Sequence, residues 1–472
     1  MGGIIKIAAA GLALALLSAL PARARADTLC ERLTAIALPH AVVTAAAVMP
    51  AGSVTACKIN VTSRPTRDSN IGIEVWIPAG GAWNGRYVQL GNGGFAGSIR
   101  SQALAALAAQ GYAAAMTDDG HQSAVGTDAS WAIGHPEKVV DFGWRALKET
   151  TTDARALIGA YRGARPKFAY FNGCSDGGRE ALMEAQRFPG DFDGIVAGAP
   201  AYNFSGLLTL GAYDMQALNA PGGYLNGDKL KALEAAALAQ CGGGTYIADP
   251  LACHFDPARI ACPAGEDRPD CLTGAQLATA RTLYRGLVSA NGKLRYPGYS
   301  PGGEAEPGSW KVWITGAARD QIGKALIHGF STGFWGGFVF GDPNYDILKL
   351  DIAGAPRQAA RIAAIVNSTD PNLTAFRARG GKLIQYHGWN DPAIPPRGSI
   401  VYYENVRATM GDVDGFYRLY LIPGMLHCGG GQGPSGVNWL SLIQDWVEQG
   451  RPPRDLVAKS ATAQQTLHPY TR

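Results

Sequence analysis

The sequence contains little charge and no run of basic residues. Charged residues make up 17% of its 472 residues, and the formal net charge at pH 7 is only +4. Proteins that bind nucleic acid or anionic membranes usually carry clusters of lysine and arginine, so we expect neither kind of partner. Internal repeats and low-complexity linkers are also missing. With 47% hydrophobic residues, the composition is that of a soluble globular protein with a large core and two structural units.

Only the N-terminus carries a long apolar run. Residues 7–20 are almost wholly apolar, Lys6 precedes them, and residues 24–26 read Ala-Arg-Ala, which suits a signal-peptidase site. The pattern predicts a signal peptide over residues 1–26 and a secreted or periplasmic mature chain. An N-terminal membrane anchor is the alternative, but the run is short and no stop-transfer segment follows it. We therefore expect no stable membrane association.

The cysteines contain no C-x-x-C pair. All eight lie beyond the predicted signal, and an even number in an oxidising compartment predicts disulfides. Zinc binding within residues 241–271 is the competing interpretation, which the missing C-x-x-C pair weakens. Sequence alone does not fix the connectivity. The pairs that spacing suggests are Cys30–Cys57, Cys241–Cys253 and Cys262–Cys271, which leaves Cys174 and Cys428 for each other.

Strand-like and helical segments alternate over two parts of the chain, which predicts a mainly parallel sheet covered on both faces. Residues 203–371 break this rhythm with four cysteines, many glycines and prolines, and an aromatic stretch at 330–340. We predict a catalytic domain of residues 27–202 and 372–472, interrupted by a disulfide-pinned lid domain at 203–371. The expected strands are 71–77, 86–90, 112–116, 167–172, 192–197, 382–387 and 417–422, and the expected helices are 103–110, 139–161, 179–187 and 439–448.

The strongest motif is G-x-S-x-G at residues 173–177. It lies between an expected strand and an expected helix, the context of the nucleophile turn in α/β-hydrolases. Flanking glycines relieve the crowding of such a sharp turn. Ser175 is therefore the predicted nucleophile, and a glycine-rich turn without chemistry is the alternative.

A serine nucleophile needs a base to accept its proton. In the α/β-hydrolase fold the acid and then the histidine follow the serine along the chain, each after a later strand. Asp391 follows the strand expected at 382–387, and His427 follows the strand expected at 417–422. His387 as base would break this order, so we expect it to line the substrate pocket instead.

Two cysteines flank these residues. Cys174 precedes the predicted nucleophile, and Cys428 follows the predicted base. A disulfide holds its two Cα atoms within about 7 Å, so a bond between them would make Ser175 and His427 neighbours. Two unrelated cysteines are the alternative.

The negative charge of a tetrahedral intermediate requires two N–H donors. We expect one from the backbone of Asp176 and the other from the glycine-rich loop at residues 91–97, with Gly94 or its neighbour Gly93 as the donor. This loop lacks the spacing of a dinucleotide-binding fingerprint.

With these residues assembled, the chain resembles the tannase and feruloyl esterase family, which includes the bacterial hydrolase of mono(2-hydroxyethyl) terephthalate. The resemblance covers the glycine-rich loop, the arrangement Cys174-Ser175, Asp391 and His427-Cys428, and a large lid. It implies an α/β-hydrolase fold and the four cysteine pairs. It also implies a secreted serine carboxylic ester hydrolase that cleaves small aromatic esters, feruloyl, caffeoyl or galloyl, through an acyl-enzyme on Ser175.

The same resemblance implies that the lid clamps the aromatic acyl group. Expected walls are Phe334, Trp335, Phe338 and Phe340 with Ile394 beside the acid, and a lid core made by the four aromatic residues is the alternative.

Family members often carry an Asp-rich calcium loop between the lid cysteines that correspond to Cys241 and Cys253. Here that stretch is short and holds only Asp249, whereas calcium takes six to eight oxygen ligands. We therefore expect no metal and no cofactor.

Two rival functions stay open from the sequence. One is a serine hydrolase of other substrates, such as a terephthalate monoester, an aliphatic polyester, a lipid or a peptide. The other is a non-catalytic binding protein on a hydrolase scaffold, against which the intact Ser175 motif argues.

Overall fold

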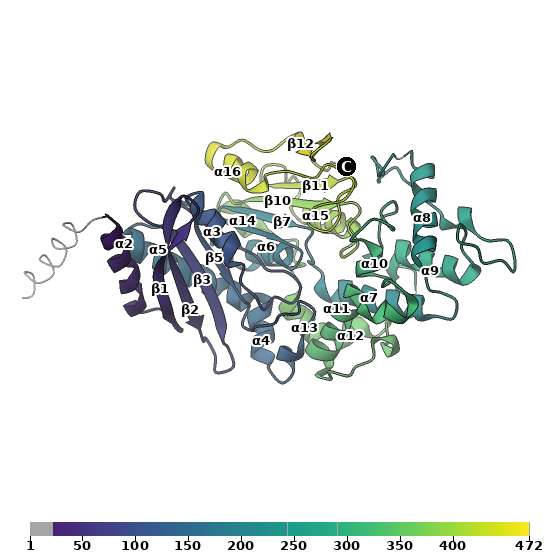
Figure 1. Ribbon diagram of the computed structural model, residues 1–472, viewed down its shortest axis with the longest axis horizontal. Coiled ribbons are helices and arrows are strands. Elements are labelled where there is room, and N and C mark those ends of the chain that lie inside the picture. The colour runs from purple at the N-terminus through teal and green to yellow at the C-terminus, as the bar shows by residue number, and fades with distance from the viewer. Residues whose placement is uncertain (1–21, 243, 290, 472) are drawn as a thin grey trace, which may run out of the picture.

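One large sheet runs through the middle of the molecule (Figure 1). The computed structural model describes residues 22–242, 244–289 and 291–471, and within them this sheet has nine strands in the order β1-β2-β3-β5-β4-β6-β7-β10-β11. Residues 1–21 of the predicted signal lie outside the described residues, and helix α2 (Ala22–Glu31) follows them. No helix in the described ranges is long and apolar enough to cross a membrane.

The sheet is antiparallel at one edge and parallel elsewhere. Strands β1, β2, β3 and β5 pair in antiparallel fashion, and β5, β4, β6, β7, β10 and β11 pair in parallel. The strands are β1 (Ala41–Ala51), β2 (Val54–Ser63), β3 (Ile71–Pro78), β4 (Arg86–Leu90), β5 (Ala113–Thr117), β6 (Phe168–Cys174), β7 (Gly194–Gly198), β10 (Lys382–Gly388) and β11 (Tyr417–Ile422). All seven expected strands are present, whereas β1 and β2 were not predicted.

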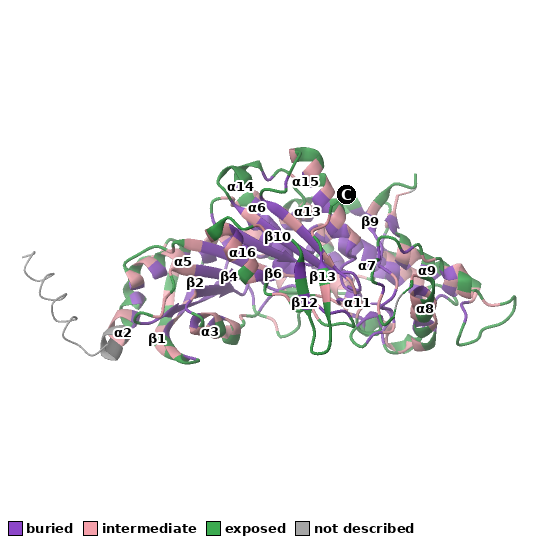
Figure 2. Ribbon diagram, turned by 90° about the horizontal axis from the view of Figure 1, so that it is seen from above, coloured by how far each residue is buried: buried purple, intermediate pink, exposed green. Residues whose placement is uncertain are grey.

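Helices cover both faces of this sheet, because neighbouring residues of a strand point to opposite faces. Ile195 of β7 belongs to one core cluster with the side chains of α5, α6 and α15, and Val196 belongs to another with those of α3 and α16. Figure 2 shows the strands as a mostly buried layer. The helices are α3 (Ser101–Ala109), α5 (Ala146–Arg162), α6 (Asp176–Arg187), α15 (Arg397–Met410) and α16 (Trp439–Gln449).

The helix expected at 139–161 is divided. Helix α4 (Pro136–Val140) passes through the π-helical segment η3 (Asp141–Arg145) into α5. Within this turn Arg145 pairs with Asp141, at 2.5 Å from Nε to Oδ1.

Residues 203–371 are called the insert below, and the described part of them, all but residues 243 and 290, adds no strand to the large sheet. They are mainly helical and gather to one side of the sheet (Figure 1). Their core contains Leu210, Met215 and Leu283, and it also includes Phe95 and Phe142 from the part of the chain before the insert. Their elements are α7 (Phe204–Asn219), α8 (Gly227–Gln240), η4 (Pro257–Ile260), α9 (Gly274–Arg285), β8 (Gly286–Val288), β9 (Leu294–Pro297), α10 (Trp310–Trp313), η5 (Arg319–Lys324), α11 (Leu326–Thr332), η6 (Gly333–Phe340), η7 (Ile347–Lys349), α12 (Ala355–Gln358) and α13 (Ala360–Val366).

After the insert, α14 (Thr374–Ala378) precedes β10, and the hairpin β12 (Leu456–Lys459) with β13 (Gln464–Leu467) closes the chain. A short 3-10 turn, η1 (Arg32–Ala35), precedes β1, and another, η2 (Ser130–Ala132), follows β5.

Four disulfides are formed, and they are the pairs that spacing suggested. Cys30–Cys57 joins α2 to β2, and two local bridges, Cys241–Cys253 and Cys262–Cys271, lie in the insert. Cys174–Cys428 spans 254 positions of sequence with its Cα atoms 6.0 Å apart. The eight cysteines are therefore all used in disulfides, which leaves no thiolate for zinc.

The insert core generates a stability prediction. Trp335 is fully buried, and its indole Nε1 donates to the carbonyl of Leu208 at 3.3 Å. We expect Trp335→Ala to lower the free energy of unfolding by about 3–5 kcal/mol, because it leaves a cavity in the core and removes this hydrogen bond. Urea unfolding measures this change. Phe340→Ala in the same segment is the control, because Phe340 is 41% exposed, and a cost there equal to that of Trp335→Ala would contradict the prediction.

Candidate active site

Ser175 occupies a strained turn between β6 and α6. Its backbone has φ 68° and ψ −120°, a positive φ that non-glycine residues rarely adopt. The turn is possible because its surroundings are glycine. A Cβ on Gly173 would lie 2.3 Å from the carbonyl oxygen of Gly177, and a Cβ on Gly178 would lie 2.2 Å from that of Gly198. The motif therefore raises Ser175 out of the sheet edge on a turn that only these glycines permit.

Asp391 follows β10 and is fully buried, so its charge depends on its partners. Its Oδ1 accepts hydrogen bonds from the backbone N–H groups of Ala393, at 2.8 Å, and Ile394, at 2.9 Å. Its Oδ2 faces Nδ1 of His427 at 2.8 Å and Nε2 of His387 at 3.1 Å. Burial alone would raise the pKa of Asp391, but the charge of His427 and hydrogen bonds from both histidines bring the pKa well below its usual value. Asp391 therefore stays an anion across the neutral range.

His427 follows β11, and the disulfide next to it ties this loop to the turn that carries Ser175. Because Cys174 and Cys428 are bonded with their Cα atoms 6.0 Å apart, their neighbours in sequence, Ser175 and His427, lie at the same edge of the sheet. The imidazole is 13% exposed. With Nδ1 engaged by Asp391, Nε2 is the nitrogen left to exchange a proton with a hydroxyl.

His387 lies behind the acid and not in the pocket. Its side chain is completely buried, its Nδ1 meets Ser399 Oγ at 2.7 Å, and its Nε2 lies 3.0 Å from the carbonyl of Ile394. Since Nε2 faces two acceptors, that carbonyl and the Asp391 carboxylate, it carries the proton and donates. The expectation that His387 lines the substrate pocket is thus corrected, because burial at the end of β10 turns its ring toward Asp391. The sequence held a signal for this contact in the four-residue spacing.

A mostly apolar pocket opens at Ser175. Both predicted oxyanion positions, Gly94 and the first residue of α6, Asp176, line it together with Ser175. Ile394 lines it as well, as predicted. The remaining lining residues are Ala201, Phe204, Leu207, Leu208, Trp313, Ile327, Phe330 and Ala393. The pocket therefore joins the loops of the sheet edge to helices of the insert.

The N-terminus of α6 points toward the pocket through Asp176. The first N–H groups of a helix have no partner inside the helix and carry its positive end, which favours an anion there. Gly94 has φ 62°, and a Cβ on it would lie 2.6 Å from the carbonyl oxygen of Gly126. Only glycine fits at this loop position.

The aromatic walls differ from those expected. Trp335 and Phe338 do not line the pocket but are buried in the core of the insert. Both rings pack against Phe334, and the ring of Phe338 also packs against Phe95. The rings at the pocket are Phe330, Phe204 and Trp313.

Of these rings, Phe330 lies at the start of the aromatic stretch that the sequence displayed, while Trp313 had no such signal. Trp313 also contacts the base, since its ring centroid lies 5.1 Å from that of His427 at an interplanar angle of 67°.

The loop between Cys241 and Cys253 offers few metal ligands. Asp249, its acidic residue, has Oδ1 accepting from the N–H groups of Leu251 and Ala252 at 3.2 Å each. Among the described residues, the group of three acidic, histidine or cysteine side chains close enough to share an ion is Asp119, Asp176 and Glu180. It lies beneath the nucleophile turn.

The disulfide next to the nucleophile generates the next prediction. A fluorophosphonate probe should label Ser175, and the double variant Cys174→Ser, Cys428→Ser should be labelled at least about 10-fold more slowly, because small displacements of reacting groups are costly. The labelling rate is measured by mass spectrometry below the unfolding temperature of each variant. Removing the Cys262–Cys271 bridge instead is the matched control. Equal labelling rates in the two double variants would contradict the coupling.

Comparisons with known proteins agree with this geometry. A model of the family "Tannase and feruloyl esterase" matches residues 57–472. An uncharacterized esterase of Xanthomonas campestris is 38% identical, over 94% of this chain and 86% of its own length. A probable feruloyl esterase B-2 of Aspergillus terreus is 31% identical, over 89% of this chain and 82% of its own length.

Solved structures give the same result. Feruloyl esterase B from Aspergillus oryzae superposes with a TM-score of 0.86 at 26% identity, covering 94% of this chain and 96% of that one. Tannin acyl hydrolase from Aspergillus niger shares the fold, with a TM-score of 0.77 at 23% identity over 96% and 93% of the two chains. The chain has a fold of the α/β-hydrolase type, and it belongs to the tannase and feruloyl esterase family of carboxylic ester hydrolases.

Proposed function

We propose that this enzyme hydrolyses esters of phenolic and other aromatic carboxylic acids through an acyl-enzyme on Ser175. The observation that carries this substrate class is the pocket itself. Phe204, Trp313 and Phe330 lie around the same opening as Ser175, and flat aromatic groups bind best against such rings and aliphatic walls.

The reaction proceeds in two steps. Ser175 Oγ attacks the ester carbonyl carbon while His427 Nε2 takes its proton, and the carbonyl oxygen becomes an anion held by the N–H groups of Asp176 and Gly94. The carbon–oxygen bond to the alcohol then breaks, and the alcohol leaves with the proton from His427. Water, deprotonated by His427, attacks the acyl carbon, and Ser175 leaves as the hydroxyl when its proton returns. The products are the free acid and the alcohol.

Asp391 keeps the base in its working form. The carboxylate accepts from Nδ1 of His427 at 2.8 Å, which fixes the tautomer and stabilises the imidazolium that forms in each step. His387 is a second donor to the same oxygen, at 3.1 Å, and so holds the carboxylate in place.

The chemistry uses protein groups alone. A nucleophile, a base, an acid and two N–H donors complete an acyl transfer without a Lewis acid. We therefore propose that the enzyme needs no cofactor. With Asp249 as the acidic residue between Cys241 and Cys253, and its Oδ1 already engaged by two N–H groups, we also propose that the insert holds no calcium.

The enzyme is proposed to act outside the cytoplasm. Its four disulfides are typical of proteins that fold in an oxidising compartment.

We also propose that residues 203–371 form a lid domain over the active site. Helices α7 and α11 of this insert support the proposal, because they contribute Phe204, Leu207 and Ile327 to the pocket.

Removal of the nucleophile tests the mechanism. Ser175→Ala should lower kcat on methyl ferulate by at least about 10⁴-fold, because the acyl-enzyme cannot form. Product release is followed by chromatography, with Ser441→Ala on the exposed start of α16 as a control that keeps wild-type turnover. Turnover by Ser175→Ala at the rate of the control would end the proposal.

A change in the pocket wall tests the substrate class. Phe330→Ala should lower kcat/KM for methyl ferulate about 10-fold more than for p-nitrophenyl acetate, since only the larger acyl group buries a ring against Phe330. Phe340→Ala, in the same stretch but away from the pocket, should leave kcat/KM unchanged for both methyl ferulate and p-nitrophenyl acetate. A panel of feruloyl, galloyl, terephthaloyl and aliphatic esters ranks the acyl groups. A preference of the wild-type enzyme for long aliphatic esters would contradict the aromatic assignment.

A further inference from the structure

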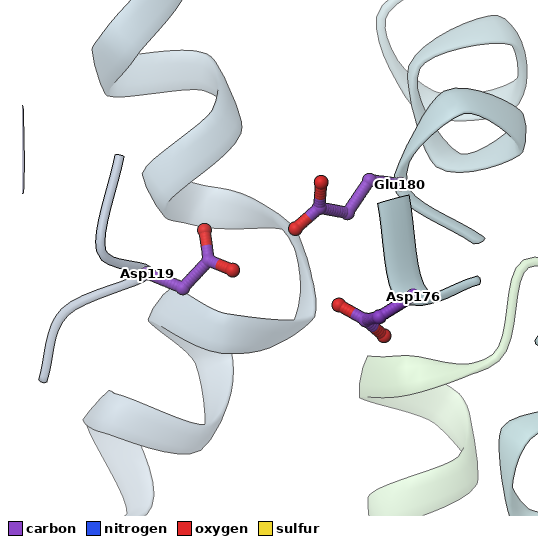
Figure 3. A group of neighbouring side chains, drawn as sticks. All are labelled: Asp119, Asp176 and Glu180. Carbon is purple, nitrogen blue, oxygen red and sulfur yellow. The ribbon is translucent and has the colours of Figure 1, made fainter. Parts of the chain in front are cut away.

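Three carboxylates and one guanidinium are buried together beneath the nucleophile turn. Asp119 follows β5, and Asp176, Arg179 and Glu180 belong to the first turns of α6. Each of the four is at most 1% exposed. Ligand atoms of the three carboxylates all lie within 4.8 Å of one another, and Figure 3 shows the side chains of Asp119 and Glu180 directed toward each other with Asp176 beside them. Such a concentration of like charge away from water requires a compensating partner.

The cluster holds the oxyanion loop. Asn92, two residues before Gly94, donates its backbone N–H to Glu180 Oε2 at 2.8 Å and its side-chain amide to Asp119 Oδ2 at 3.0 Å. Its carbonyl accepts from the N–H of Gly177 at 2.9 Å. Asn92 therefore joins the loop to the helix whose first N–H group is the other expected oxyanion donor.

Arg179 cannot neutralise the whole cluster. Its Nε and Nη2 bind the two oxygens of Asp176 at 2.5 and 3.0 Å, and its remaining hydrogen bonds go to backbone carbonyls, including that of Gly143. Asp119 Oδ1 and Glu180 Oε1 have no hydrogen-bond partner among the described residues. In the described part of the chain, the hydrogen bonds of Arg179 go to Asp176 and to backbone carbonyls, and not to Asp119 or Glu180. Two adjacent carboxylates without a bonded cation cannot both stay ionised in a dry site, so a proton is the simplest partner.

The pKa directions agree with this geometry. Burial, and then the charge of Asp176, raises the pKa of Glu180 to about 7. Burial, and then the charge of Glu180, raises the pKa of Asp119 well above its usual value. A metal ion is the less favourable partner, because calcium and magnesium take six or more oxygen ligands and both oxygens of Asp176 already bind Arg179.

We propose that Asp119 and Glu180 share one proton, and that this protonated pair is a positioning element of the oxyanion hole. The shared proton turns mutual repulsion into a hydrogen bond, so both carboxyl groups keep their acceptor oxygens on Asn92. Gly94 and the start of α6 are thereby held at a fixed separation. This inference rests on the proposed function, since the hole it positions serves acyl transfer at Ser175.

The sign of the pH effect follows from the raised pKa values. Protonation of the pair is favoured in the folded state, so the positioning is complete at low pH and is lost as pH rises through the folded pKa. Loss of the proton leaves two adjacent anions that repel each other and loosen their hold on Asn92. Because the oxyanion hole acts on the transition state, kcat should fall while KM changes little.

Other charged groups surround the pair. Glu184 lies one turn further along α6, and Asp141 with Arg145 packs against the turn after β5. Asp118 accepts from the N–H groups of Gly72 and Gly120, and burial raises its pKa to about 7. Asp118 is therefore the group whose titration must be separated from that of the pair.

The test is the pH dependence of kcat on p-nitrophenyl acetate between pH ~6 and ~9 for matched variants. The wild-type enzyme should lose about 10-fold in kcat above pH ~7 at nearly constant KM. Glu180→Gln imitates the protonated carboxyl, so it should keep most of the neutral-pH kcat and abolish the alkaline fall. Glu180→Leu has no acceptor for Asn92 and should lose about 100-fold at every pH. Asp118→Asn is the control and should keep the wild-type fall.

Infrared spectroscopy and metal analysis complete the experiment. Other buried carboxyl groups, Asp118 among them, also contribute to the protonated-carboxyl band at neutral pH. Glu180→Gln and Asp119→Asn should each lower that band by the intensity of one carboxyl group relative to the wild-type protein, a readout that holds even if either variant is less stable. An alkaline fall that persists in Glu180→Gln, or that disappears in Asp118→Asn, would overturn the proposal. So would a stoichiometric metal ion that the same variants release. Failure of the proposed function can be told apart from failure of this inference. A protein whose Ser175 is neither labelled nor active at any pH would refute the proposed function, whereas the infrared band of the carboxyl pair can be measured without any activity.

Discussion

Parallel pairing of β6, β7, β10 and β11 brings the carboxyl ends of these strands to one edge of the sheet. Ser175, Asp391 and His427 are far apart in sequence but lie at this one edge, because each occupies the loop after its strand. Ser175 follows β6, Asp391 follows β10 and His427 follows β11. The Cys174–Cys428 disulfide adds a covalent tie across 254 positions at the same edge. The rest of the site, including the pocket and the oxyanion loop, is built around this meeting point.

The second constraint is that charged groups buried near the active site must be stabilised. Asp391 and the pair of Asp119 and Glu180 are stabilised in different ways. Asp391 is an anion satisfied by two backbone N–H groups and two histidines, so its charge is kept and its pKa falls. Asp119 and Glu180 share Asn92 as donor, whereas the nearby Arg179 binds both oxygens of Asp176 instead. Their environment favours a proton in place of charge. Identical functional groups thus take opposite protonation states because the number of donors around them differs.

The pocket shows how the insert gives the site its shape. Phe204, Leu207 and Leu208 of helix α7 line the pocket together with Ser175. Their spacing of three and four positions places them on one face of the helix. The same helix contributes Leu210 and Met215 to the core of the insert. A segment with aromatic residues on several sides must bury some of them, which is why Trp335 and Phe338 stabilise the insert while Phe330 reaches the pocket.

Local patterns in the sequence were enough for the parts of the site that depend on local geometry. The glycines around Ser175 indicated the strained turn, because a Cβ at Gly173 or Gly178 would collide with backbone atoms. The order of strands and loops along the chain indicated Asp391 and His427. The seven expected strands and the four disulfides are also found in the structure. Strand β1 was missed because an edge strand with partly exposed faces has a weaker apolar pattern. Strand β2, which lies inside the sheet and alternates between buried and partly buried residues, was missed as well.

Tertiary structure decided what depends on the direction of a side chain. Whether His387 faces substrate or Asp391, and which aromatic rings of the insert reach the pocket, follows from how separate segments pack, and sequence carries no direct record of that orientation. The protonation of Asp119 and Glu180 depends on the same packing. These residues follow different strands and lie 61 positions apart along the chain, so only the folded chain brings their charges within reach of each other.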